Sequence, residues 1–216
     1  MKTATLLAVC RVQQLRQDPG NVGITAIDKH PVEGPVKVNR LGIYADIQAD
    51  RQHHGGPDQA LYAYSQAEAE EWERRLGREL PAGIFGENLR VDGIETTGAV
   101  IGERWRIGPD VEVEVTGPRT PCATFQRWLD EPHWVKRFTE AGLVGCYLRV
   151  LKTGQITAGD QIHQLFVPSH GVTIGKWFSS PDLNDVEALR DAAADGELVL
   201  HEDLPGKFEK LEQRLT

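Results

Sequence analysis

One cysteine, Cys122, stands in a setting that suits chemistry. It ends the run Pro118-Arg119-Thr120-Pro121-Cys122, which follows the alternating segment 111–115. The two prolines restrict the local backbone, and the nearby guanidinium of Arg119 would stabilise a thiolate. A thiolate is the ligand that soft or sulfur-rich metal centres prefer. We therefore predict a reactive or metal-binding thiol on a rigid turn at the end of a strand.

A second polar run lies upstream and suits an anion. It reads Asp50-Arg51-Gln52-His53-His54-Gly55-Gly56-Pro57. An arginine offers a planar fork of donors to phosphate, and paired glycines let successive backbone N–H groups curl around an anion. The two histidines could also be metal ligands, although adjacent histidines on a strand point to opposite faces. Taken alone, the run is equally consistent with a tight turn.

A third motif, Phe85-Gly86-Glu87-Asn88-Leu89, could lie close to a ligand. Gly86 allows close approach of a ligand, and Asn88 can both donate and accept hydrogen bonds at a heterocycle edge. A plain turn from loop to strand explains this motif equally well when it is considered alone.

The composition limits the class of protein. The chain has 216 residues, a net charge of −8 and 40% hydrophobic residues. This acidic balance argues against nucleic-acid or membrane-surface partners, which require a basic face, but leaves room for a local basic pocket. No run approaches the length of a membrane span, and residues 1–10 are predicted to form a first strand, not a signal peptide.

Cysteine usage indicates a reducing compartment. The chain has only three cysteines, a small and odd number that argues against a disulfide framework, so we predict a cytoplasmic protein. Cys10 and Cys146 lie within apolar strand patterns and are predicted to be buried. The phosphate-loop, dinucleotide-binding, nucleophile-elbow and zinc-peptidase motifs are all absent from the sequence, so these activities are poorly supported.

The elements that must position these motifs are mostly strands. Short apolar or alternating runs between glycines and prolines predict strands at 5–12, 23–27, 36–44, 100–107, 111–115, 143–151 and 161–167. Many short strands favour a barrel or a sandwich. Ser65 and Glu68 form a capping box that predicts a helix ending at Gly77, and a second helical stretch is expected over 124–140, broken near Pro132.

The end of the chain changes character and predicts helices. Asn184 and Glu187 form a further capping box, for a helix that ends at Gly196, and a last helix starts at about Lys207. We expect two domains, a barrel over 1–166 and a small helical domain over 167–216. The helical part is too small for a strong core of its own, so it should pack on the barrel or on a partner chain.

Taken together and in this order, the motifs resemble the MOSC family, named after the C-terminal domain of molybdenum cofactor sulfurases. The resemblance covers about residues 23–166 and rests on segments 46–57, 85–89, 118–122, 142–150 and 156–162. The tail resembles a three-helix domain appended to one bacterial subgroup, although it is shorter. A further departure is Cys146 after Gly145, where an aromatic residue is expected.

The resemblance implies a mainly β fold: a MOSC-type β-barrel with a few helices and a small C-terminal helical domain. It also implies a molybdopterin-type molybdenum cofactor, with Cys122 as the molybdenum ligand. The residues expected to line the pterin and phosphate site are Arg51, His53, His54, Gly55, Gly86, Asn88, Arg119 and Thr120.

For the function, the resemblance implies an oxidoreductase that reduces N-hydroxylated compounds such as hydroxylaminopurines. Because the sequence carries no flavin or iron–sulfur motif, a separate reductase would have to supply the electrons. One alternative is a non-catalytic carrier of the cofactor, or of sulfur as a Cys122 persulfide. Another is a cysteine hydrolase in which His53 or His54 activates Cys122. The sequence leaves open whether the chain forms a homodimer.

Overall fold

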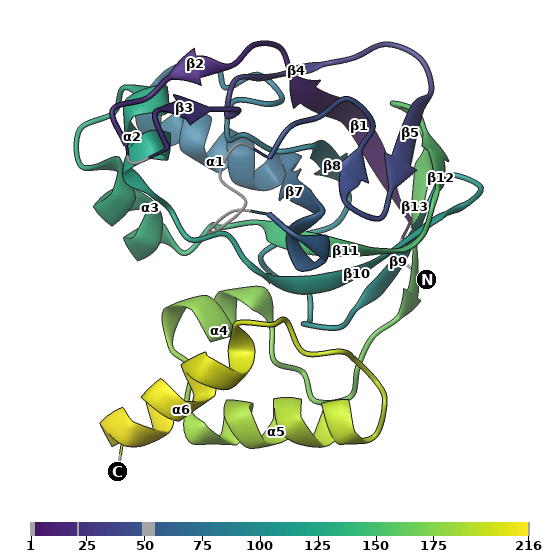
Figure 1. Ribbon diagram of the computed structural model, residues 1–216, viewed down its shortest axis with the longest axis vertical. Helices are drawn as coiled ribbons and strands as arrows, with labels where there is room; N and C mark the ends of the chain where they lie inside the picture. The colour runs from purple at the N-terminus through teal and green to yellow at the C-terminus, as the bar shows by residue number, and fades with distance from the viewer. Residues whose placement is uncertain (1–2, 21, 49–54, 216) are drawn as a thin grey trace.

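The computed structural model describes residues 3–20, 22–48 and 55–215, and its centre is a closed β-barrel (Figure 1). Seven strands follow one another around it in the order β13-β9-β10-β11-β7-β8-β1, and pairing of β1 with β13 closes the ring. All pairs are antiparallel except β7 with β8. The strands are β1 (Thr3–Val12), β7 (Leu61–Ser65), β8 (Leu89–Asp92), β9 (Arg104–Ile107), β10 (Val111–Pro118), β11 (Cys146–Lys152) and β13 (Gln161–Phe166). The predicted β-barrel is confirmed.

The barrel forms because alternate residues of its strands are apolar. In β10, Val111, Val113 and Val115 are buried, and the intervening Glu112 is half-buried. This period of two sends one face of the strand into the barrel interior. The strand continues to Pro118, so the 118–122 run lies at the end of the barrel.

Smaller sheets flank the barrel. β4 (Lys29–Pro31) pairs with β1, β2 (Arg16–Gln17) pairs with β3 (Ile24–Thr25), and a three-stranded sheet contains β5 (Val36–Asn39), β6 (Gly42–Ile43) and β12 (Gly154–Ile156). The prediction of one strand over 36–44 was therefore wrong. The chain reverses between β5 and β6 because Gly42 takes a φ of 117°, and a Cβ there would lie 2.4 Å from the carbonyl oxygen of Ala60.

Other boundaries also differ from the sequence prediction. The strand predicted over 100–107 begins at Arg104, and Val100 instead forms an isolated bridge with Thr173. The strand predicted over 23–27 shortens to β3. Strands β7 and β8 were not predicted at all.

Three helices cover one end of the barrel: α1 (Gln66–Leu76), α2 (Ala123–Leu129) and α3 (Trp134–Ala141). The capping box prediction for α1 is confirmed in its first half, since the Ser65 hydroxyl accepts from the backbone N of Glu68, and Gly77 ends the helix with a φ of 67°. The break predicted near Pro132 separates α2 from α3. An aromatic cluster joins these helices to one another, with the rings of Trp72 and Trp134 at 4.4 Å between centroids.

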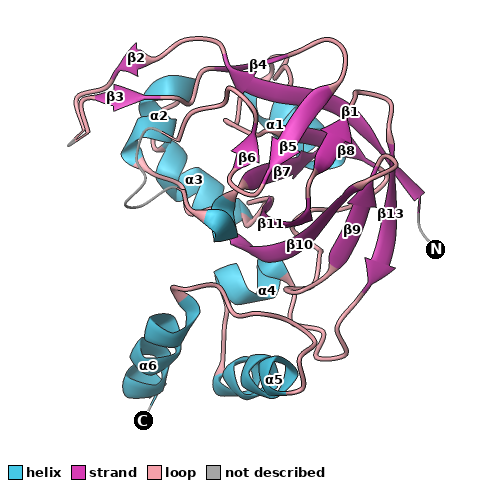
Figure 2. Cartoon of the chain, turned by 45° about the vertical axis from the view of Figure 1, so that its right-hand side comes forward, coloured by secondary structure: helices cyan, strands magenta, loops and turns pink. Residues whose placement is uncertain are grey.

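The tail lies against one side of the barrel as three helices, α4 (Ile174–Ser179), α5 (Leu183–Ala194) and α6 (Leu204–Leu215) (Figure 2). Helix α4 packs on β10, and Trp177, Leu189 and Phe208 belong to the same hydrophobic cluster as the barrel core. The expectation that the tail packs on the barrel is therefore confirmed. The division into two domains after residue 166 stays a prediction.

The helix boundaries in the tail needed correction. The capping box of α5 is formed by Asp182 and Asp185, two residues before the predicted pair Asn184 and Glu187. An aspartate after Pro181 can cap the helix as well as an asparagine can, so the helix starts at the earlier site. Helix α6 starts at Leu204, before the predicted Lys207, because proline is tolerated in a first helical turn and Pro205 stands there.

Candidate functional site

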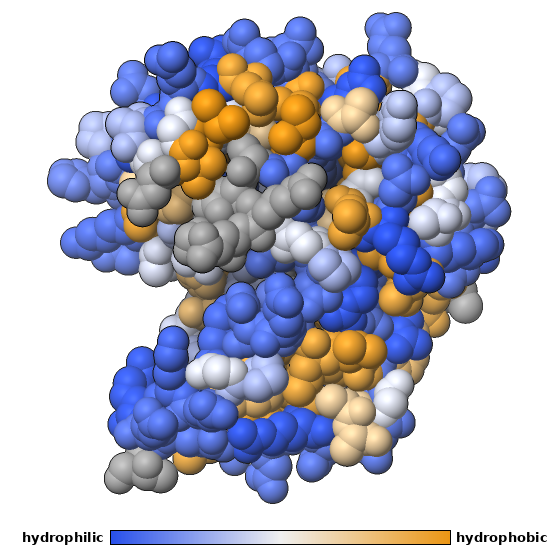
Figure 3. All heavy atoms as spheres, in the orientation of Figure 1, coloured by the Kyte–Doolittle hydropathy of each residue, from blue (hydrophilic) through white to orange (hydrophobic). Residues whose placement is uncertain are grey.

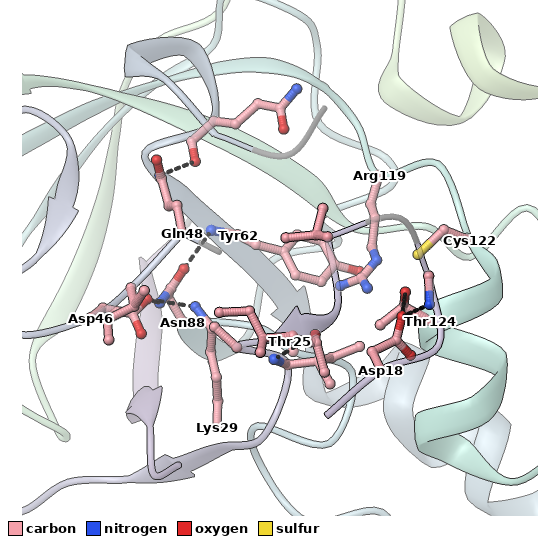
Figure 4. A pocket seen from close by; sticks show the side chains of 18 of the residues that line it. Asp18, Thr25, Lys29, Asp46, Gln48, Tyr62, Asn88, Arg119, Cys122 and Thr124 are labelled. Atoms are coloured by element: carbon pink, nitrogen blue, oxygen red, sulfur yellow. Dashed lines mark hydrogen bonds and ion pairs between the residues drawn. The ribbon is translucent and has the colours of Figure 1, made fainter. Parts of the chain in front are cut away.

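A cavity of about 710 Å³ opens at the end of the barrel, between the β2–β3 hairpin, the start of α2 and the segment that follows β6 (Figure 4). Four predicted residues from two separate motifs, 85–89 and 118–122, line it: Gly86, Asn88, Arg119 and Cys122. The fold therefore brings these motifs together, although they lie far apart in the sequence.

Cys122 presents its thiol at the cavity wall. It occupies the position before the first turn of α2, with extended backbone angles, and is half-buried. Cys10 and Cys146 are both fully buried, as predicted. Burial raises the pKa of Cys10 to about 12 and the pKa of Cys146 well above its usual range, so both stay protonated. Cys122 is thus the thiol that a ligand in the cavity can reach.

Arg119 is a buried cation in the same wall. Its Cζ lies 4.3 Å from the ring centroid of Phe125 and 4.9 Å from that of Tyr62, and Nη1 donates to the carbonyl oxygen of Phe85. Only 8% of Arg119 is exposed. No carboxylate forms an ion pair with it within the residues that the structure describes. Because a buried charge without a counterion is unfavourable, this guanidinium suits an anionic ligand.

A charged pair occupies another part of the wall. Lys29 Nζ lies 2.6 Å from Asp46 Oδ2, and both side chains are about nine-tenths buried. Asn88 holds this pair, because its Nδ2 donates to Asp46 Oδ2 at 2.8 Å and to the carbonyl oxygen of Cys10 at 3.2 Å. Its Oδ1 accepts from the backbone N of Tyr62. Both the amide nitrogen and the amide oxygen of Asn88 therefore have partners within the protein, and its predicted contact with a heterocycle stays a prediction.

The β2–β3 hairpin is tied to α2 across the cavity. Asp18 accepts hydrogen bonds from Arg127 Nε at 2.9 Å and Nη2 at 2.7 Å, and from the hydroxyl of Thr124 at 3.0 Å. The hydrogen bond from Arg127 lowers the pKa of Asp18 below its usual range. This paired geometry holds the hairpin beside the thiol-bearing turn.

Gly86 makes the packing around Arg119 possible. Its φ is 74°, and a Cβ at this position would lie 3.0 Å from Cγ1 of Ile27 and 3.3 Å from Nη1 of Arg119. The sequence predicted that Gly86 allows close approach of a ligand, and this stays a prediction. The groups that approach in this structure are the side chains of Ile27 and Arg119.

A model of the MOSC domain matches residues 50–163, which is more than half of the chain. The chain belongs to the MOSC family. It is 31% identical over 196 residues to "Uncharacterized protein YflK" of Bacillus subtilis, covering 88% of this chain and 86% of that protein. It is also 31% identical over 137 residues to "Protein YiiM" of Escherichia coli, covering 62% of this chain and 61% of that one.

Further similarities place this MOSC chain near YiiM proteins in fold. The crystal structure of YiiM from Geobacillus stearothermophilus matches 96% of the chain and 98% of its own with a TM-score of 0.76 and 25% identity. That of YiiM from Escherichia coli matches with a TM-score of 0.73 and 20% identity, over 100% of this chain and 94% of that one. A protein named "Reductase" from Gibberella moniliformis is 33% identical over 147 residues, which is 67% of this chain but only 26% of that protein.

The remaining site predictions for this MOSC chain fall elsewhere. Thr120 lines a second cavity of about 80 Å³ between the barrel and the tail, which shares Gln59 and Tyr147 with the large one. Gly55 is half-buried and is not among the lining residues of either cavity. Arg51, His53 and His54 lie outside the described residues. Their roles stay predictions.

Sequence reasoning missed several lining residues of this MOSC chain, including Lys29, Asp46 and Asp18. Of these three residues, Asp46 alone lies in a segment that carries the family resemblance (46–57), so the sequence indicated only its position. Within residues 3–20, 22–48 and 55–215, no three His, Cys, Asp or Glu residues are grouped as a metal site. No helix in the described part of the chain is long and apolar enough to cross a membrane.

Proposed function

We propose that this MOSC chain binds a molybdopterin-type molybdenum cofactor in the large cavity and reduces N-hydroxylated compounds, such as hydroxylaminopurines. A separate reductase would supply the electrons. The observation that carries the proposal is that Cys122 and Arg119 line the same wall. The thiol is accessible, and the buried guanidinium has no carboxylate partner among the described residues.

The residues present fit such a cofactor. A thiolate at Cys122 would be a soft ligand for molybdenum, and Arg119 would donate to an anionic group of the cofactor. Lys29 adds a second cation to the same cavity, although Asp46 balances its charge. The volume of about 710 Å³ lies within the range typical of cofactor sites. When bound, the cofactor supplies two-electron redox chemistry at its metal, whereas the protein supplies positioning and electrostatics.

The family resemblance adds five residues to this proposal. Arg51, His53, His54, Gly55 and Thr120 would contact the pterin or its phosphate. The polar run that contains the first four leads directly into Gln59, which lines the cavity.

The rim of the cavity suits a substrate with an apolar body. Val22, Ile24 and Ile47 line the cavity but keep 46%, 44% and 44% of their surfaces exposed. Figure 3 shows hydrophobic side chains gathered on the upper part of this face. Exposed apolar side chains that rim a polar cavity commonly mark a ligand surface. A planar N-hydroxylated base would cover them while its polar end points inward.

The similarity to a protein named "Reductase" supports the redox part of the proposal. The same thiol also supports one alternative, a non-catalytic carrier that holds the cofactor, or sulfur as a Cys122 persulfide, and passes it on. The hydrolase hypothesis depends on His53 and His54, which lie outside the described residues.

The test is to produce the chain in a host that makes the cofactor and to measure molybdenum per protein. We expect nearly stoichiometric metal in the wild type and in the control Cys146→Ala, and its loss in Cys122→Ala. Circular dichroism would confirm that each variant folds. Absence of molybdenum from a folded wild type would refute the proposal.

Turnover separates the reductase from the carrier. The loaded wild type should reduce 6-hydroxylaminopurine with an artificial electron donor such as reduced methyl viologen, but not with NADPH alone. Stoichiometric molybdenum without turnover would favour the carrier, and turnover with NADPH alone would contradict the need for a separate reductase.

A further inference from the structure

The loop between α5 and α6 contacts the barrel at a point next to the large cavity. On the barrel side the contact is the short 3-10 helix η1 (Pro57–Gln59), which directly follows the polar run 50–56. On the tail side it is the segment 197–203. The tail thus meets the chain where one wall of the cavity begins.

Asp58 is the centre of this contact and is 8% exposed. Its Oδ1 accepts from Arg149 Nε at 2.8 Å and pairs with Nη2 at 2.7 Å, and its Oδ2 accepts from the backbone N of Glu202 at 2.9 Å. The hydroxyl of Thr116 donates to its carbonyl oxygen. Asp58 therefore links η1 to β11, to β10 and to the tail loop.

Arg149 extends these links along the barrel. It also donates to Glu114 at 2.9 Å and to the carbonyl oxygen of Val199 at 3.1 Å, while Arg104 donates to Glu114 at 3.0 Å and to the carbonyl oxygen of Glu197 at 2.9 Å. Two backbone carbonyls of the loop are thus held by guanidinium groups that are themselves paired. Such networks fix the position of a segment more firmly than single exposed pairs do.

His201 makes the second contact between the loop and η1. Its Nδ1 accepts from the backbone N of Asp203 at 3.1 Å, so in the neutral ring the proton is on Nε2. That Nε2 lies 3.4 Å from Nε2 of Gln59, which would place two N–H donors face to face. In the same arrangement Oε1 of Gln59 is buried with no partner in the described part of the chain. Rotating the Gln59 side-chain amide by half a turn lets its Oε1 accept from Nε2 of His201, and we assign the amide this orientation.

Gln59 connects this contact to the large cavity. Gln59 lines both cavities, and its carbonyl oxygen accepts from Gln48 Nε2 at 3.3 Å. Gln48 lines the large cavity as well, and its Oε1 accepts from the backbone N of Gly56 at 3.2 Å. A displacement of His201 would therefore reach Gln59, Gln48 and the end of the polar run.

We propose that His201 is a positioning residue for the large cavity: through Gln59 it fixes the wall formed by η1. The tail is then part of the site and not only an attachment to the barrel. The proposal does not depend on which ligand the cavity binds, so it stands or falls separately from the molybdenum hypothesis.

The contact should also respond to pH. Burial lowers the pKa of His201, so the ring is neutral at physiological pH. Protonation would place a donor at Nδ1 against the N–H of Asp203. The charged groups that face the ring are Asp58 on η1, and Glu202, Asp203 and Lys207 in the tail. The three acids favour the charged ring but do not outweigh its burial. The contact therefore weakens as the pH falls below the ordinary histidine value of 6.5.

The test is amide hydrogen exchange over residues 55–60 in the cofactor-free protein, corrected for intrinsic rates, at pH about 7.5 and about 5.5. In the wild type we expect slow exchange at the higher pH and about tenfold faster exchange at the lower one. His201→Ala should exchange fast at both. His201→Gln retains a donor toward Gln59 but does not titrate, so it should exchange slowly at both.

Val199→Ala is the matched control, because it shortens an exposed side chain of the same loop but keeps the backbone carbonyl that accepts from Arg149. It should behave like the wild type. Exchange in the wild type that does not change with pH, or equal rates in wild type and His201→Ala, would overturn the proposal. Should His201→Ala fail to fold, the comparison of wild type with His201→Gln still decides.

Discussion

Replacing Gly86 with alanine tests the packing that fixes Arg119 in the cavity wall. The added Cβ would lie 3.0 Å from Cγ1 of Ile27 and 3.3 Å from Nη1 of Arg119. Contacts this short require a neighbour to move. The guanidinium cannot retreat freely, because Nη1 donates to the Phe85 carbonyl and the group lies 4.3 Å from the ring centroid of Phe125.

Two costs add up in this variant. The φ of 74° is unfavourable for alanine by about 1–2 kcal/mol. Overpacking against Ile27 and Arg119 adds about 1–3 kcal/mol. Gly196→Ala is the matched control, since Gly196 has a φ of 77° but no atom within 4 Å of its Cβ position. The control should show the backbone cost alone.

Urea unfolding of the cofactor-free proteins measures both costs. We expect Gly86→Ala to lower the free energy of unfolding by about 1–3 kcal/mol more than Gly196→Ala does, with the same dependence on urea. In the loaded protein, only Gly86→Ala should also lose molybdenum. Equal destabilisation by the two substitutions would refute the reasoning, since Arg119 would then be free to move aside.

Two further predictions concern the thiols and the hairpin. Alkylation of the native protein should modify Cys122 alone, because Cys10 and Cys146 are buried and protonated and should react only after denaturation. Peptide mass spectrometry after a timed reaction measures this. Early labelling of either buried thiol would contradict the described core. Asp18→Asn should lower stability at neutral pH by less than about 1 kcal/mol, because Arg127 is partly exposed. Since the pKa of Asp18 is lowered in the folded state, the stabilisation by its carboxylate is fully present above the ordinary pKa of 3.8 and disappears as the pH falls through the lowered pKa. If the wild type remained more stable than Asp18→Asn in strong acid, ionisation of Asp18 would not be the cause of the difference.

Short strands that alternate or sit between glycines and prolines predicted a barrel or a sandwich, and the family resemblance implied the barrel. These patterns missed β7 and β8 for a physical reason. All five residues of β7 and three of the four in β8 are buried, so neither strand shows the alternation that marks a half-buried strand. Strand β7 also continues directly into α1 at Ser65, and the capping box there indicates the start of a helix but not the strand before it.

The site was predictable only where its signal is local. The thiol-bearing turn, Gly86 and Asn88 each belong to a short motif, and the structure places them on one cavity. The pair of Asp18 with Arg127 spans 109 residues, and no pattern along the chain indicates it. The same holds for His201 and Gln59, which are 142 residues apart.

The charge balance in the large cavity explains how an acidic chain can hold an anion. Within the described wall, Lys29 is paired with Asp46, and Arg127 is paired with Asp18. Among the described residues of this wall, Arg119 is the cation without a carboxylate partner, and its burial among aromatic rings keeps water from screening it. A local positive charge can thus persist in a protein whose net charge is −8. Because it lies in the same wall as the Cys122 thiol, this charge favours an anionic ligand where a soft metal would also be held.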